Sequence, residues 1–144
     1  TRVRSSAASD VYKRQEVLLR ITSKADNSSI YEHIGQMPIT VMKIRTKTLD
    51  TLIREEEIDM NNYDFLNIDA EGSEFDVLEG MQRNLHKINY LFFEASLRER
   101  YKGAKNFKAL HEYVVDKGFE LVTLSDSFET LGWGDAFYRR DKKK

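Results

Sequence analysis

The spacing of hydrophobic and polar residues changes several times along this chain, and each change predicts a different element. Residues 16–23 (EVLLRITS) and 39–46 (ITVMKIRT) are rich in β-branched and aliphatic side chains and predict two strands. Residues 24–36 between them are polar and predict a turn-rich loop. Pro38 stands before the second strand, where its missing N–H removes no interior ladder hydrogen bond.

After residue 47 the period becomes that of a helix. Leu49, Leu52 and Ile53 lie on one helical stripe, and Thr48 is a suitable N-cap residue. Two nearly continuous apolar runs follow at 63–70 (YDFLNIDA) and 88–95 (INYLFFEA). Such runs predict strands that are covered on both faces, as in a parallel sheet.

Further elements complete an alternating order. Residues 73–85 have apolar positions at helical spacing, and a third helix begins after Asn106 and ends at Gly118. Residues 119–124 and 135–140 predict the last two strands, with Gly132, Trp133 and Gly134 in the loop between them. Alternating strands and helices predict an α/β fold with parallel strands and right-handed crossovers. About ten residues separate the last two strands, too few for a crossover, so these strands should form a terminal antiparallel hairpin.

Composition narrows the class of protein. The 144 residues include 23 Lys and Arg, 24 Asp and Glu and no Cys, for a formal net charge of -1. Without Cys there is no disulfide framework, zinc ribbon or thiol nucleophile. The near-neutral charge argues against a nucleic-acid partner, and no apolar run reaches the length of a membrane span. No secretory leader is recognisable, so we expect a cytoplasmic protein without a membrane partner.

The chain divides into three parts. Residues 1–15 (TRVRSSAASDVYKRQ) lack periodicity and predict a non-native or flexible segment, while residues 16–140 form the domain. Residues 141–144 (DKKK) predict a disordered basic tail. We see no internal repeat.

Acidic residues gather where two predicted strands end. Asp69 finishes the first apolar run, and Glu94 stands near the end of the second. Neighbouring strands lie about 4.8 Å apart, so two carboxylates at their ends can face one site. Glu71 and Glu74 add negative charge, which suits a proton acceptor or a bound cation. For Glu74 the simpler interpretation is stabilisation of a helix N-terminus.

Five blocks in order carry a family resemblance: KTLDTLI (47–53), YDFLNIDAEGSEFDVLEGM (63–81), LFFEAS (91–96), KGFELV (117–122) and WGDAFY (133–138). Together they resemble the FkbM-type S-adenosylmethionine-dependent methyltransferases over about residues 39–140. The resemblance implies a class I, Rossmann-like methyltransferase sheet, S-adenosylmethionine as cofactor, and methylation of a hydroxyl on a sugar or natural-product-like small molecule. It places Asp69 near the reactive end of the cofactor, and Glu71 and Glu94 in the substrate cleft, so that these three are the candidate catalytic residues.

The glycines depart from this family's pattern. None of the seven glycines forms a Gly-x-Gly-x-x-Gly loop after an N-terminal strand, although such a loop lets the backbone approach the cofactor. We therefore expect the C-terminal part of a methyltransferase domain, inactive by itself and weak in cofactor binding. The strand at 63–69 should then lie at an open edge of the sheet, unless the first two strands complete it.

The loops after the strands supply the candidate substrate contacts. Arg98, Tyr101 and Trp133 can bind anions or sugars. His86 and His111 fall on polar helix faces, where we expect solvent, while His33 lies in a loop.

Two other functions fit the acidic residues. Asp69, Glu71 and Glu94 would hold magnesium in a hydrolase or phosphotransferase. For the methyltransferase we name no metal ligand, although a metal-supported methyltransferase would blur this distinction. The third possibility is a non-catalytic remnant, which the missing glycine loop favours.

Overall fold

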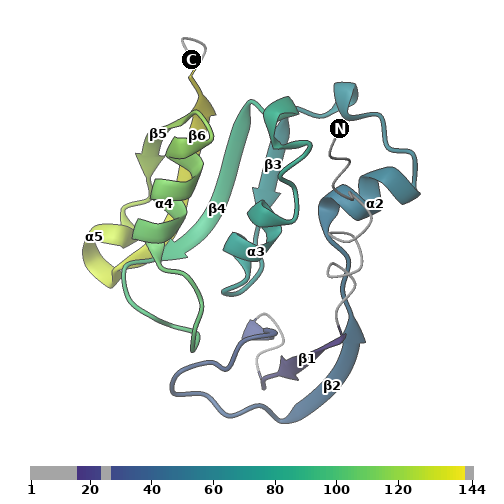
Figure 1. The fold of residues 1–144 in the computed structure, drawn as a ribbon. Helices are drawn as coiled ribbons and strands as arrows, with labels where there is room; N and C mark the ends of the chain where they lie inside the picture. The colour runs from purple at the N-terminus through teal and green to yellow at the C-terminus, as the bar shows by residue number, and fades with distance from the viewer. Residues whose placement is uncertain (1–15, 24–26, 142–144) are drawn as a thin grey trace, which may run out of the picture.

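The computed structural model describes residues 16–23 and 27–141, and it contains two separate sheets. Strands β1 (Glu16–Ile21) and β2 (Thr40–Arg45) pair antiparallel with each other. The four-stranded main sheet has the order β3-β4-β6-β5, formed by β3 (Phe65–Ile68), β4 (Tyr90–Ser96), β5 (Phe119–Leu124) and β6 (Trp133–Arg140). Figure 1 shows the β1–β2 pair lying below the main sheet rather than extending it.

The main sheet is mixed. Strands β3 and β4 are parallel, while β6 is antiparallel to both β4 and β5. The predicted antiparallel pairing of the last two strands is therefore confirmed, although β6 begins at Trp133 rather than at residue 135. The connection also contains a short helix, α5 (Ser127–Leu131), which ends at Gly132 in the left-handed conformation. Gly132 has a φ of 74°, which glycine adopts without a steric penalty from Cβ.

Besides α5, three longer helices precede β3, β4 and β5 in turn: α2 (Leu49–Glu55), α3 (Glu74–Glu79) and α4 (Phe107–Asp116). The predicted N-caps are confirmed, because Thr48 accepts a hydrogen bond from the Thr51 N–H and Asn106 accepts one from the Ala109 N–H. The helix predicted over 73–85 is too long. It stops at Gly80 and continues as turns, ending in a 3₁₀ turn at Leu85–Lys87.

Asp50 stabilises the turns that follow this early end. Its buried carboxylate accepts hydrogen bonds from the Arg83 N–H and the Asn84 side chain, and its own N–H bonds to the Gly80 carbonyl. The Arg83 N–H is therefore bonded to a side chain of α2 rather than to the carbonyl four residues earlier, as a continuing helix would need.

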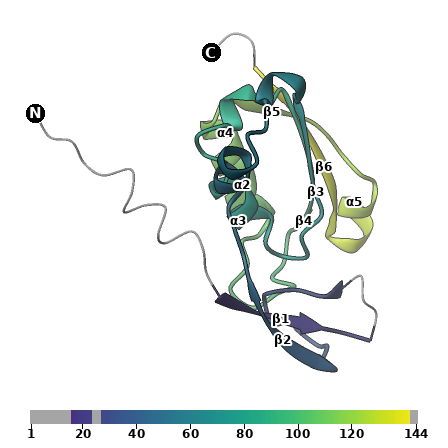
Figure 2. The ribbon, with the colours of Figure 1, turned by 90° about the vertical axis from the view of Figure 1, so that its right-hand side faces the viewer.

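Helices α2, α3 and α4 lie on one side of the main sheet, and α5 lies on the other (Figure 2). The core is on the three-helix side, where Leu91 and Phe93 of β4 meet Leu78 of α3, and Tyr138 stacks on Phe93 with ring centroids 5.3 Å apart.

The prediction that β3 and β4 are covered on both faces is wrong for the described part of the chain. Burial alternates along both strands because the three larger helices share one side, leaving Phe65 51% and Tyr90 36% exposed on the other. The prediction that β3 lies at an edge is confirmed for the described strands, among which β4 is its only neighbour. The expectations for residues 1–15 and, apart from Asp141, for the tail at 141–144 fall outside the described residues. No described helix is long and apolar enough to cross a membrane.

Candidate functional site

The candidate site lies at the carboxyl ends of the two parallel strands. The register places Ile68 beside Phe93. Asp69, which follows β3, and Glu94, the next residue of β4, therefore lie at the same height along the two strands. Asp69 directly follows β3 and is exposed, and no described residue forms a hydrogen bond or ion pair with its carboxylate. Because the Asp69 carboxylate is exposed to water, it does not need the protein partner that a buried carboxylate would need. Glu94 lies within β4, opposite Asp135, rather than at the end of the strand as expected.

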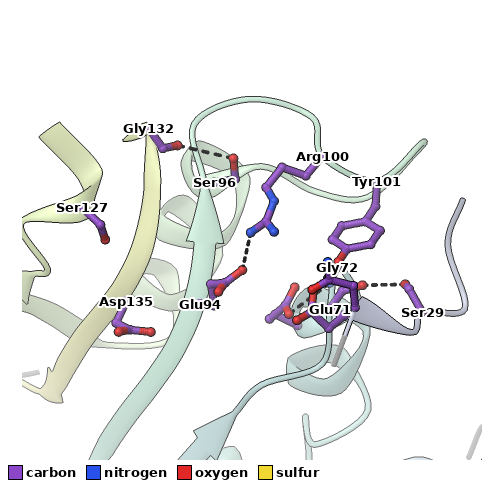
Figure 3. Close-up of polar contacts among 12 residues, drawn as sticks. Ser29, Glu71, Gly72, Glu94, Ser96, Arg100, Tyr101, Ser127, Gly132 and Asp135 are labelled. Atoms are coloured by element: carbon purple, nitrogen blue, oxygen red, sulfur yellow. Dashed lines mark hydrogen bonds and ion pairs between the residues drawn. The ribbon is translucent and has the colours of Figure 1, made fainter. Parts of the chain in front are cut away.

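A hydrogen bond from Tyr101 stabilises the turn that follows Asp69. Its hydroxyl donates a hydrogen bond to the Glu71 carboxylate, and the ring is 3% exposed (Figure 3). Glu71 has a φ of 45° and Gly72 a φ of 96°. A Cβ on Gly72 would lie 2.7 Å from Cδ2 of Tyr101, so only glycine leaves room for the ring. Burial and the neighbouring Glu71 carboxylate both raise the pKa of Tyr101, which keeps the hydroxyl protonated as a donor.

A segment far away in the sequence holds the same turn from the other side. The Ser29 hydroxyl donates to the Glu71 carbonyl at 2.5 Å, and the Tyr31 hydroxyl donates to Asp76 at 2.7 Å. The same segment contacts the loop after β4, because the Ile34 N–H bonds to the Arg100 carbonyl at 2.8 Å. We call residues 29–34 the clasp. Sequence reasoning missed it, because residues 24–36 show only the polar composition of a loop.

Glu74 supports the turn from inside. Its carboxylate accepts hydrogen bonds from the Ala70 and Gly72 N–H groups at 3.2 and 3.1 Å, and the residue is 5% exposed. Burial raises its pKa, an effect that the two backbone hydrogen bonds partly oppose. These contacts fit the simpler interpretation of Glu74, which is stabilisation of the helix N-terminus.

Glu94 and Arg100 form an ion pair at 2.5 Å across the site (Figure 3). Desolvation raises the pKa of Glu94, and the charges of Glu71 and Glu74 act in the same direction, while Arg100 lowers it. The Arg100 guanidinium also stacks on Trp133, with Cζ 4.5 Å from the ring centroid. One face of Trp133 is thus already covered by Arg100, a residue that the sequence analysis did not select as a candidate.

A small pocket opens between these elements, and we call it the edge pocket. Its lining includes Gly72, Glu74, Glu94, Arg98, Arg100 and Tyr101. The structure therefore brings Glu94, Arg98 and Tyr101 to one pocket, whose lining includes neither Asp69 nor Trp133. Within residues 16–23 and 27–141, no group of three or more His, Asp or Glu side chains is arranged to hold a metal ion.

The histidines have different environments. His86 is exposed, as expected. The expectation of a solvated His111 is wrong, because its Nδ1 lies 3.0 Å from the hydroxyl of the fully buried Tyr138. A tyrosine hydroxyl in the core needs a polar partner, and His111 on α4 supplies it. His33 belongs to the clasp and meets Tyr101 edge to face, with ring centroids 5.0 Å apart.

These features define an α/β domain with a mixed sheet and an acidic site at the carboxyl edge of its parallel strands. The sequence matches the Methyltransferase FkbM domain over residues 6–121, and the chain belongs to this methyltransferase family. The match includes β1, β2 and the clasp, upstream of the blocks that carry the resemblance, and it ends within β5. No curated protein and no solved structure matches the chain.

Proposed function

We propose that this protein takes part in methylation of a hydroxyl group on a sugar or natural-product-like small molecule, with S-adenosylmethionine as methyl donor. The observation that carries the proposal is the exposed Asp69 carboxylate, without a described partner, beside the Glu94 strand at the carboxyl edge of the sheet. Family membership supports methyl transfer as the reaction class. We also propose that the sheet of this domain is Rossmann-like.

The described residues fit one end of the cofactor. S-adenosylmethionine supplies a methyl group on a positively charged sulfur, and the exposed carboxylate of Asp69 suits a cation at that edge. For the adenosine end of the cofactor we identify no matching glycine turn, because no described strand is followed by a Gly-x-Gly-x-x-Gly sequence. We therefore assign Asp69 to the cofactor's charged end and place the remainder of the cofactor site outside the described residues.

The chain's own residues account for the acceptor side. A hydroxyl acceptor must lose its proton, and a carboxylate within hydrogen-bond reach can accept it or orient the hydroxyl. Asp69 is open to solvent for this role, whereas Glu71 and Glu94 are bonded to Tyr101 and Arg100. We assign Asp69 the direct role, and Glu71 and Glu94 the shaping of the cleft.

Transfer of a labelled methyl group from S-adenosylmethionine to a sugar hydroxyl tests the proposal, in a protein that joins this chain to a cofactor-binding segment. Asp69→Asn should lower turnover by about 10²–10⁴-fold and leave thermal stability nearly unchanged. Asp116→Asn, an exposed change on α4, is the matched control and should retain turnover. Equal turnover in the two variants would remove Asp69 from the mechanism, and absence of any transfer would reject the function.

A further inference from the structure

We propose that the edge pocket recognises an anionic group, a carboxylate or a phosphate, carried by the methyl acceptor. The inference rests on the proposed function only in taking the ligand to be the acceptor, since anion binding is a property of the chain itself. It follows from the partners of the charged side chains that line the pocket.

Each acidic side chain that lines the pocket accepts hydrogen bonds from groups of the protein itself. Glu94 is paired with Arg100, and Glu74 accepts two backbone N–H groups. Glu99 accepts the Gly103 N–H at 2.6 Å. Two hydroxyls at the pocket are also engaged, because Tyr101 donates to Glu71 and the Ser96 oxygen accepts the Arg98 N–H.

Two cationic side chains of the pocket differ from these acids in their partners. Arg98 and Lys105 both line it, and neither charged group forms a hydrogen bond or ion pair with a described residue. The only described contact of the Lys105 ammonium is with the Phe75 ring, 5.7 Å from its centroid. A pocket whose acids are bonded internally and whose remaining charges are cations offers donors to a ligand rich in acceptor oxygens.

Arg100 neutralises one of the neighbouring acids, Glu94. Its guanidinium donates a hydrogen bond to Oε1 of Glu94 and stacks on the Trp133 ring. A planar guanidinium fixed by stacking and pairing keeps that carboxylate from competing with a bound anion. The acceptor class is then a hydroxylated acid or a phosphorylated sugar.

Binding to the chain as it stands tests this inference without methyl transfer. Calorimetric titrations at low salt compare D-glucuronate, D-glucose 6-phosphate and D-glucose, which share a ring and differ in the anionic group. We expect saturable binding of at least one anionic sugar and none of D-glucose. The carboxylate and phosphate titrations decide which anion the pocket prefers.

Arg98→Gln and Lys105→Gln should each weaken binding by about three- to tenfold. Lys108→Gln is the matched control, because it removes one lysine charge from an exposed position of α4 that does not line the pocket. Binding of D-glucose as tight as that of both anions, no binding of either anion, or equal losses in all three variants would overturn the inference. Methyl transfer to neutral sugars alone would also overturn it while leaving the proposed function intact.

Discussion

The hydroxyl of Tyr101 donates a hydrogen bond to the carboxylate of Glu71 and so joins the turn after β3 to the loop after β4. The two residues are 30 positions apart in the chain, and the Tyr101 ring lies against the backbone of Gly72. The geometry of the acidic turn therefore depends on a side chain from the neighbouring loop.

Tyr101→Phe removes this hydrogen bond and keeps the ring. We expect a loss of about 1.5–3 kcal/mol in the free energy of unfolding, as for a hydrogen bond to a charged group. Tyr31→Phe is the control, because the Tyr31–Asp76 hydrogen bond is exposed and should be worth less. Urea denaturation measures both, and an equal or smaller loss for Tyr101→Phe would contradict the importance of this contact.

Gly72→Ala tests the close approach of the Tyr101 ring. A left-handed non-glycine residue costs about 1–2 kcal/mol, and the clash with the ring adds about 1–3 kcal/mol. Gly103→Ala is the matched control, since its φ is also positive, at 83°, and its Cβ would enter open space. In a Tyr101→Ala background the extra cost at Gly72 should disappear, and an unchanged cost in the double variant would reject the steric explanation.

Glu74 should make stability fall as the pH rises. Burial raises its pKa above the usual 4.5, so the folded chain binds this proton more tightly than the unfolded chain does. The contribution of protonated Glu74 is complete below about pH 4.5 and is lost as the pH rises through the raised pKa. Glu74→Gln keeps an acceptor oxygen and does not ionise, so its melting temperature should fall less between about pH 4 and pH 7. The exposed Glu79→Gln should follow the wild type, and parallel profiles for all three proteins would refute this assignment.

The open edge of β3 should make the chain self-associate. Its N–H and C=O groups on that side have no strand partner within residues 16–23 and 27–141, and the segment YDFLNID has neither Pro nor Lys to block pairing. Sedimentation at about 10 μM should show dimers or larger species. Phe65→Lys places a charge on this edge and should restore the monomer. Val122→Lys on β5, the other edge, is the control, because the irregularity between Leu121 and Thr123 already disturbs that strand. A monomeric wild type would contradict the prediction.

The chain by itself should bind S-adenosylmethionine weakly or not at all. The charged end of the cofactor has Asp69, but the described residues contain no glycine loop for the adenosine end. Calorimetric titration measures this, and a dissociation constant near 1 μM, about -8 kcal/mol, would show that another segment replaces the glycine loop.

Features that depend on neighbours in the sequence were predictable. The caps at Thr48 and Asn106 were correct, since a cap is set by residues within one turn. The strand at 119–124 was also placed correctly. The turns after α3 were not predictable, because Asp50 reaches them from another helix.

The sequence by itself determined the order of the strands and of the three longer helices, the family, and the collection of acidic residues at one edge of the sheet. All three follow from local periodicity and from short motifs around Asp69. The tertiary structure decided which partner each acid has. Ser29 and Glu71 are 42 residues apart, and no periodic pattern links them. Such contacts depend on how the separately formed elements pack, so the clasp, the Tyr101–Glu71 hydrogen bond and the one-sided cover of the sheet became visible only in the folded chain.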